Sequence, residues 1–481
     1  MRAGWLLALL TGLAAGSAVA EDRIWLVGGG PDAAGSQVSI ELNTRWIAGW
    51  LREEGLGPRL RIRYNDGDAP GADVKLRRRD RAGTDLSPLV HVFGAPGTEG
   101  EAYRNHRVRG VEGSTRVEEL TRALEADFRE LESGDDLWFI YQGHGLADHA
   151  DYSRNTLRLW GDTELSVRRL EGLLDEVEPG VTTRFFFPQC YSGGFARLMY
   201  DDPAAPGELA GGRCGFLAQA PDRQSEGCTS SIEAGEYRDY STYFFAALAG
   251  EQRTGESLEH DPDRDGDGRV DLREAHLHAL ATAESADLSR ATSEVFLEEW
   301  EPWWLRWVGT RGVPDNTYGE LAATVAERLG LDPADPVPAL HQGLDRTKGE
   351  GERLRRELDA ARERVRELQR AVRERAEVRW PALASRYSTA ALERLTSEPE
   401  PILEWLHRDP DYPDLVAAIE RQRELEAEEL AVQRERAGYE RILRLRRLAR
   451  LQEKFRRYAS EEERAAYRAL VACESWAPGN P

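Results

Sequence analysis

A histidine and a cysteine each follow an apolar run of this 481-residue chain, and together they can carry out thiol-based acyl transfer. The first run ends in Gln142-Gly143-His144-Gly145, and the second ends in Pro188-Gln189-Cys190. A cysteine thiolate attacks a carbonyl carbon, and an imidazole protonates the leaving amine. We therefore take Cys190 as the candidate nucleophile and His144 as the candidate proton donor.

Small residues surround this pair and leave room for a substrate backbone. Glycines flank His144 on both sides, and Ser192-Gly193-Gly194 lies just beyond Cys190. The backbone amides of Gly145 and Cys190 are the expected donors to a tetrahedral oxyanion. The residues after Cys190 are expected to form the first turn of a helix, whose N-terminus would favour the thiolate and lower its pKa.

The elements that must position the pair are two buried strands. Residues 137–141 and 185–187 are continuous apolar runs, which are typical of strands buried on both faces of a parallel sheet. Open parallel sheets bind ligands at the carboxyl ends of their strands. The 46 residues between His144 and Cys190 are enough for one crossover, so the two side chains are predicted to meet at that edge.

The chain from 21 to 310 alternates apolar runs with amphipathic stretches. This pattern predicts an α/β fold with a mostly parallel sheet flanked by helices. Further strands are expected at 24–27, 60–64 and 89–93. Helices are expected at 36–54, with Ser36 as the cap, at 117–131 and at 166–176.

A strand with His-Gly, followed by a strand with Gln-Cys, resembles the caspase–legumain–gingipain clan of cysteine peptidases. Tyr191-Ser192-Gly193-Gly194 is more similar to legumain-type and bacterial caspase-like members, whereas Pro188 departs from the small residue of caspases. Residues 26–31, Ser36-Gln37 and residues 292–297 also resemble segments of secreted bacterial members, so the similarity covers roughly residues 22–305. The resemblance implies a caspase-like domain whose substrate is a protein or peptide. It also implies that His144 and Cys190 form a dyad without a third residue, which acts through a thioester acyl-enzyme.

Residues 263–274 fit the twelve-residue calcium loop of an EF-hand. Gly268 stands at the sharp turn, and Val270 is the apolar residue of the loop. The expected ligands are Asp263, Asp265, Asp267, the Arg269 carbonyl, Asp271 through water, and the bidentate Glu274. Hard oxygen ligands suit calcium, and a single loop is expected to be structural; the alternative is an acidic loop without metal.

The first twenty residues have the pattern of a secretory signal peptide. Arg2 precedes the apolar run 5–13, and Ala18-Val19-Ala20 forms a cleavage site before Glu21. An uncleaved anchor is the alternative, but this run is short for a membrane span of about 20 residues. We expect an exported, periplasmic or extracellular protein with no stable membrane span after cleavage.

Four cysteines are present, and an oxidising compartment permits disulfides. Cys214 and Cys228 are close in sequence and bracket a loop-like stretch. We therefore expect these two to pair, which leaves Cys190 and Cys473.

The composition changes near residue 310. Residues 311–349 are expected to form a connecting helical segment, and residues 350–475 a charged helical hairpin or short coiled coil. Apolar positions from Leu354 to Val372 alternate spacings of four and three, as in a heptad seam. These helices either pack on the main domain or form an arm that self-associates or binds a partner.

The formal net charge of -22 excludes the basic footprint of a nonspecific nucleic-acid binder, so no nucleic-acid partner is expected. The acidic residues Asp148, Asp151 and Asp162 either favour a basic P1 side chain or are solvated surface. A second interpretation from another class is a noncatalytic calcium-binding interaction protein on a peptidase-like scaffold. The selective reactivity of Cys190 distinguishes the two interpretations.

Overall fold

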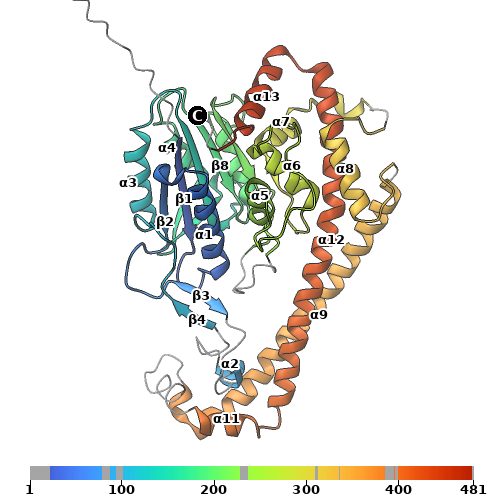
Figure 1. Ribbon diagram of the computed structural model, residues 1–481. Coiled ribbons are helices and arrows are strands. Elements are labelled where there is room, and N and C mark those ends of the chain that lie inside the picture. Colours follow the sequence, from blue (N-terminus) through green and yellow to red (C-terminus); the bar gives the residue numbers. More distant parts are fainter. Residues whose placement is uncertain are drawn as a thin grey trace, which may run out of the picture.

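The computed structural model describes residues 22–77, 87–93, 101–227, 237–308, 312–334, 336–384, 395 and 399–478. Within these residues, eight strands form one mixed, mostly parallel sheet with helices on both faces, and long helices follow it (Figure 1). The α/β fold with a helical C-terminal region is therefore confirmed. The predicted signal peptide, residues 1–20, lies outside the described residues.

The main path of the sheet has the spatial order β10-β9-β8-β5-β1-β2. Its neighbours are parallel except β10, which is antiparallel to β9. The chain passes from β1 outward to β2 and later returns to the other side of β1 as β5. The carboxyl ends of the neighbouring strands β1 and β5 thus mark the switch point, where open α/β sheets bind ligands. These strands are β1 (Asp22–Gly29), β2 (Leu60–Tyr64), β5 (Asp136–Leu146), β8 (Thr182–Phe187), β9 (Arg213–Leu217) and β10 (Arg290–Ala291).

The other four strands of the described residues form two antiparallel pairs, of which one extends the main sheet and the other is separate from it. The strand β6 (Thr156–Leu159) pairs with the end of β5, with His144 opposite Arg158, and with β7 (Thr163–Ser166). The strands β3 (Val74–Arg77) and β4 (Glu101–Arg104) form a separate antiparallel ribbon. The extension of β5 by β6 holds the His144 backbone in a paired strand.

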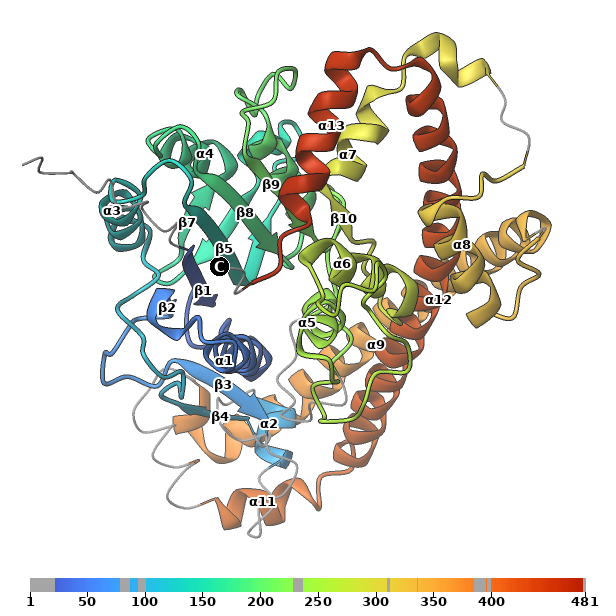
Figure 2. The same ribbon diagram turned by 45° about the horizontal axis from the view of Figure 1, so that its top comes forward.

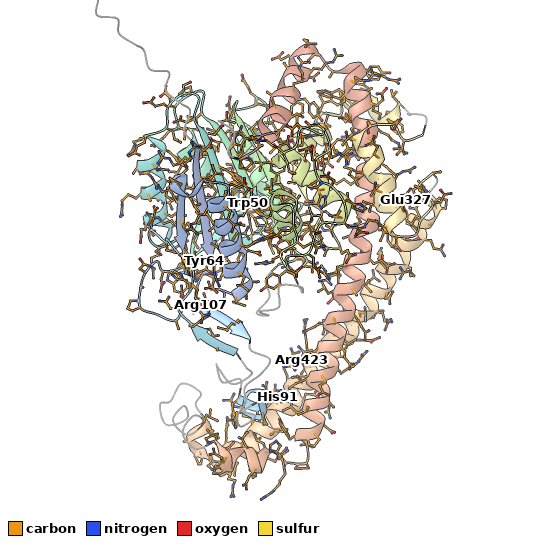
Figure 3. All side chains as sticks on the ribbon, in the orientation of Figure 1. Trp50, Tyr64, His91, Arg107, Glu327 and Arg423 are labelled. Atoms are coloured by element: carbon orange, nitrogen blue, oxygen red, sulfur yellow. A yellow bond between two sulfur atoms is a disulfide. The ribbon has the colours of Figure 1, made fainter. Side chains whose placement is uncertain are left out.

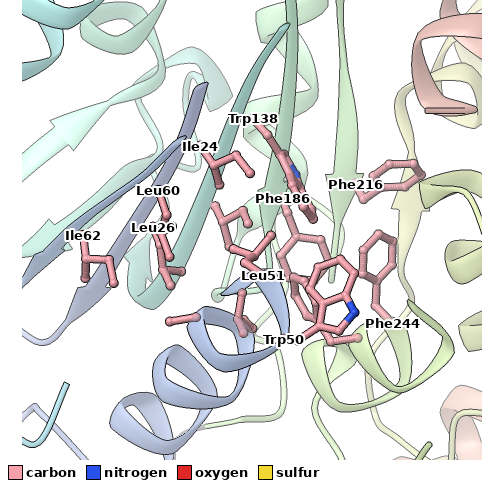
Figure 4. Close-up of a cluster of buried hydrophobic side chains, with 14 of the residues drawn as sticks. Ile24, Leu26, Trp50, Leu51, Leu60, Ile62, Trp138, Phe186, Phe216 and Phe244 are labelled. Atoms are coloured by element: carbon pink, nitrogen blue, oxygen red, sulfur yellow. The ribbon is translucent and has the colours of Figure 1, made fainter. Parts of the chain in front are cut away.

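Alternating side chains of the strands build one apolar layer on each face of the sheet. Ile24 and Leu26 face α1 (Val38–Glu53), α5 (Tyr240–Ala249) and α6 (Leu272–Thr282) (Figure 4). Trp25 and Val27 face α3 (Val117–Phe128), α4 (Val167–Leu174) and the 3₁₀ helix η3 (Ser192–Met199). Each such fully buried side chain contributes roughly 1.5–3 kcal/mol, so the strand ends that carry His144 and Cys190 extend from a well-packed core.

Two local predictions are wrong. Ser36 does not cap α1, because Gln37 holds the cap position and the Ser36 hydroxyl contacts the Gly30 amide and the Asn65 side chain. Residues 89–93 do not form a strand but belong to the helix α2 (Ser87–Phe93). The cause is tertiary packing: Leu89 is buried against the distant C-terminal helices rather than in the sheet.

The C-terminal region contains the predicted antiparallel hairpin (Figures 1 and 2). Its two long helices are α9 (Val337–Arg379) and α12 (Tyr412–Tyr458), and α9 runs unbroken through residues 349 and 350. Ion pairs cross between them in antiparallel order: Arg346–Glu435, Arg355–Glu429 and Arg362–Glu426. The remaining elements are η1 (Gly57–Arg59), η2 (Tyr152–Arg154), α7 (Thr292–Trp300), η5 (Trp303–Trp307), α8 (Thr317–Arg328), η6 (Pro381–Ala384), α11 (Glu400–Leu406) and α13 (Glu461–Glu474).

Four of the six positions of the heptad seam are buried, and Ala361 and Val365 are partly buried. Leu354 and Leu358 meet Leu425 near its middle. At its far end, Leu368 and Val372 pack with α2 and α11, near the labelled His91 and well apart from Trp50 of the sheet domain (Figure 3). The other end of α12 packs on α7 and α8.

The disulfide prediction is wrong. Cys214 on β9 is bonded to Cys473 on α13, which is 259 residues away, with a Cα–Cα distance of 6.0 Å. Cys228, the predicted partner of Cys214, lies outside the described residues. The chain end beyond α13 also packs on the sheet, where Trp476 contacts Trp138 edge to face. The disulfide and the Trp476 contact thus fix the last helix, α13, and the residues after it to the sheet.

Within the described ranges, no helix combines the length and apolar character that crossing a membrane requires.

Candidate active site

The register of β5 and β8 brings the two predicted residues to the same level. Paired residues of these parallel strands are 46 positions apart, from Asp136 opposite Thr182 to Ile140 opposite Phe186. The same offset separates His144 from Cys190 just beyond the paired segment. Both residues therefore lie at the carboxyl edge of the sheet, beside the switch point.

Gly145 shows how close the two strand ends are. A Cβ at this position would lie 2.8 Å from Cγ of Gln189 and closer still to the carbonyl oxygen of Cys190. Real Cβ atoms essentially never approach other atoms within 3.0 Å. Only glycine permits this approach, so the main chain of 144–145 is in contact with the main chain at Cys190.

The loop after β1 orients the His144 ring across the switch point. The ring Nε2 lies 2.7 Å from the carbonyl oxygen of Gly35 and 2.9 Å from Oε1 of Gln37. A carbonyl oxygen only accepts hydrogen bonds, so Nε2 carries the hydrogen and Nδ1 is the basic nitrogen of the neutral ring. Burial lowers the pKa of His144, and the nearby Arg158 charge lowers it further. The imidazole is therefore neutral at pH 7.

Cys190 is half-buried and contacts the loop that follows β9. Its Sγ lies 3.7 Å from the carbonyl oxygen of Ser225 and 3.7 Å from the Ser225 hydroxyl. Burial raises the pKa of the Cys190 thiol, and the Ser225 contacts only partly offset this effect. The prediction that a helix N-terminus lowers the thiol pKa is therefore wrong. The residues after Cys190 form only the short 3₁₀ helix η3, and burial of the sulfur is the largest effect on its pKa.

The turn after Cys190 is sharp and held from both sides. Tyr191 has a left-handed conformation, with φ of 62°, which is uncommon for a residue with a side chain. Its amide donates to the Arg223 carbonyl at 2.8 Å, and its carbonyl accepts from Nδ2 of Asn155 at 2.9 Å. Such enforced strain is common at functional turns.

No family model matches this chain, and no curated protein matches it. Among solved structures, one that resembles it is the crystal structure of protein GSU0716 from Geobacter sulfurreducens. The TM-score is 0.32 and the identity is 12%, over 56% of this chain and 93% of that chain. A likeness this distant carries no argument, so the interpretation of the site depends on its own geometry.

Sequence reasoning missed the residues that hold the pair in place. The Gly35 carbonyl and Ser225 have no local motif, because each comes from a loop distant in sequence from the residue that it contacts. A buried polar network behind the histidine was also missed: Gln142 bonds to Asn43 and Ser241, and Asn43 bonds to Asp239. Alternation along β5 places Gln142 on the same face as His144, and this is the sequence signal that could have pointed to a polar network there.

The acidic residues Asp148, Asp151 and Asp162 are engaged by their own neighbours. Asp151 caps the 3₁₀ turn η2 and pairs with Arg168 at 2.6 Å. Asp148 accepts from the amides of Ala150 and Asp151, and Asp162 pairs with Arg158. These partners support the interpretation of this loop as solvated surface.

The predicted calcium loop brings three of its carboxylates together. Ligand oxygens of Asp263, Asp265 and Asp267 all lie within 4.8 Å of one another. Oε1 of Glu274 accepts from the amides of Arg264 and Asp265 at 2.7 and 3.1 Å, so Glu274 closes the loop onto its own start. The Asp271 side chain caps α6. Carboxylates are the donor type that hard divalent cations prefer, and three of the expected ligands lie together, whereas the Glu274 and Asp271 carboxylates accept hydrogen bonds from backbone amides.

Proposed function

We propose that this protein is an exported cysteine endopeptidase of the caspase–legumain–gingipain type. The observation that supports this most strongly is that the register of two adjacent parallel strands places His144 and Cys190 at the same level of the carboxyl edge of the sheet, beside the switch point. The close approach of Gly145 to the Cys190 main chain also brings together the two residues whose amides are the expected oxyanion donors. The family resemblance of residues 22–305 points to the same chemistry.

In the proposed reaction, Cys190 Sγ attacks the carbonyl carbon of the scissile peptide bond, and the thiol proton passes to the His144 imidazole. The amides of Gly145 and Cys190 donate to the oxyanion that forms. His144 then protonates the leaving amine as the C–N bond breaks, which leaves a thioester on Cys190. Water attacks the thioester and yields its proton through His144, so that the carboxylate product leaves and the thiol is restored.

Both groups are neutral at rest, since burial lowers the pKa of His144 and raises that of Cys190. The proton therefore moves during the attack rather than before it. A thiol that is neutral at rest reacts more slowly with alkylating reagents than a thiolate does.

Calcium belongs to this proposal as a structural ion at 263–274. Asp263, Asp265, Asp267 and Glu274 would hold it with the Arg269 carbonyl, and Asp271 would act through water. The loop leads directly into α6, which packs on the apolar face of the sheet. The ion would stabilise the entry to α6 rather than take part in hydrolysis.

Digestion of a diverse peptide library by the purified protein tests the proposal. We expect cleavage by the wild type, a loss of at least about 10³-fold in Cys190→Ala and His144→Ala, and no loss in His341→Ala, an exposed histidine of α9. A noncatalytic scaffold would cleave no peptide, and its Cys190 would not react selectively with a peptidyl electrophile. Cleavage that persists in Cys190→Ala would refute the assignment.

A further inference from the structure

The long helix α12 reaches the loop that lies against the nucleophile. Residues 223–227, here termed the wall loop, follow β9 and contact the catalytic turn at three points. Ser225 touches Cys190 Sγ, the Arg223 carbonyl accepts from the Tyr191 amide, and Nε2 of Gln224 donates to the Tyr191 hydroxyl at 3.2 Å. The wall loop thus sets the position of the thiol and of the strained residue after it.

Two ion pairs tie the wall loop to α12. Nε of Arg434 donates to both carboxylate oxygens of Glu226, at 3.0 and 3.2 Å, and its Nη2 bonds to Oε1 as well. Arg223 donates to Oε2 of Glu440 at 2.5 Å. The Glu226 side chain is only 11% exposed and that of Arg434 is 32% exposed, so the carboxylate side of this pair is largely shielded from water, and the planar guanidinium fixes its geometry.

A second contact of α12 holds residues 285–287, which bond to Glu226 of the wall loop. Glu226 receives the Ala286 amide at 2.9 Å, and its own amide donates to Asp287 at 2.6 Å. The buried Arg441 donates to the carbonyls of Ser285 and Asp287, at 3.3 and 2.9 Å. The same helix therefore fixes both the wall loop and the segment on which Glu226 rests.

We propose that α12 is part of the active site, with Arg434 and Glu226 as positioning residues that hold Ser225 against Cys190. This proposal rests on the proposed function and gives the helical hairpin a role in it. Through Arg434, the helix α12 sets the position of Ser225 and thereby that of the Cys190 sulfur. The other hairpin ion pairs differ in this respect. Arg355 and Glu429, for example, join α9 to α12 and contact no residue of the wall loop in any bond that the structure shows.

Charge reversal with rescue tests this inference. We compare Arg434→Glu, Glu226→Arg and the double variant with wild type, and use the reversed pair Arg355→Glu and Glu429→Arg as the matched control. Two readouts are measured: kcat and KM for peptide cleavage, and the rate at which iodoacetamide alkylates Cys190, followed by peptide mapping. The alkylation rate needs no substrate, so it reports on the thiol even if the protein is not a peptidase.

Each single reversal is expected to lower kcat about tenfold or more with a smaller change in KM, and to change the Cys190 alkylation rate at least about fivefold. The double variant should recover most of both values, and Arg434→Lys should keep part of them. The control pair should leave both unchanged. Alkylation rates that stay at the wild-type value in the single variants would overturn the inference. A double variant as impaired as the single ones would also overturn it. If the wild type cleaves no peptide but the single variants still show altered alkylation of Cys190, the positioning role is upheld and the peptidase assignment is refuted.

Discussion

Gly145→Ala is the substitution whose effect follows most directly from the geometry of the site. The added methyl group would lie 2.8 Å from Gln189 Cγ and still closer to the Cys190 carbonyl oxygen. Ordinary van der Waals contact begins near 3.4 Å, so relieving the contact with the Cys190 carbonyl oxygen requires the ends of β5 and β8 to move apart by about 1 Å. We expect that movement to separate the two proposed oxyanion donors and to shift His144 relative to Cys190.

Overpacking of this kind costs about 1–3 kcal/mol of folding stability. Catalysis is more sensitive, because a displacement of about 1 Å costs about 10²-fold in rate. We therefore expect kcat/KM to fall about 10²-fold, which corresponds to about 2.7 kcal/mol of transition-state stabilisation.

The assay is hydrolysis of a fluorogenic peptide found by the library digestion, combined with urea denaturation. Gly172→Ala is the matched control, because Gly172 lies exposed in α4 and a Cβ there meets nothing within 4 Å. That change should stabilise the helix by about 0.5–1 kcal/mol and leave kcat/KM unchanged. Wild-type activity in Gly145→Ala would refute the close approach of the two strands.

Other perturbations test separate parts of the account. Because burial raises the pKa of the Cys190 thiol, the rate of Cys190 alkylation should keep rising with pH beyond the ordinary cysteine pKa. Because burial lowers the pKa of His144, the imidazole stays neutral below its ordinary pKa and peptide cleavage should persist there. Rate profiles measured from pH 4 to 10 check both predictions. Burial lowers the pKa of His278 from 6.5 to about 4, so the unfolded chain binds the extra proton and stability should be lost as the pH falls through this window. Denaturation midpoints should therefore depend less on pH in His278→Gln than in the wild type. Cys473→Ser should lower the free energy of unfolding by about 2–5 kcal/mol, since the bond closes a long loop, and urea denaturation under oxidising conditions measures this. Calcium should raise the melting temperature of the wild type but not that of Asp265→Asn, and an equal shift in both would contradict the proposed ligand set.

The sequence allowed the prediction of those parts of the fold that depend on local pattern. The apolar runs before His144 and Cys190 are central strands because residues buried on both faces must all be apolar. The heptad seam from Leu354 likewise predicts its own burial. These signals need no knowledge of the rest of the chain.

The failures concern long-range contacts. The 89–93 segment has an apolar composition compatible with a strand, but it is helical because Leu89 packs on helices nearly three hundred residues away in the chain. Cys214 bonds to Cys473 rather than to its near neighbour because α13 returns to the sheet beside β9. The thiol pKa was misjudged for the same reason, since its burial depends on the wall loop and not on the helix that follows it.

Selective covalent trapping of the proposed dyad tests the central claim most directly. The wild type and His144→Ala are incubated with peptidyl chloromethyl ketones, and intact mass and peptide mapping locate the adduct. We predict one adduct, on Cys190, that forms at least about 10²-fold faster in the wild type than in His144→Ala. Equal rates in the two proteins, or modification of another residue with Cys190 intact, would contradict the account.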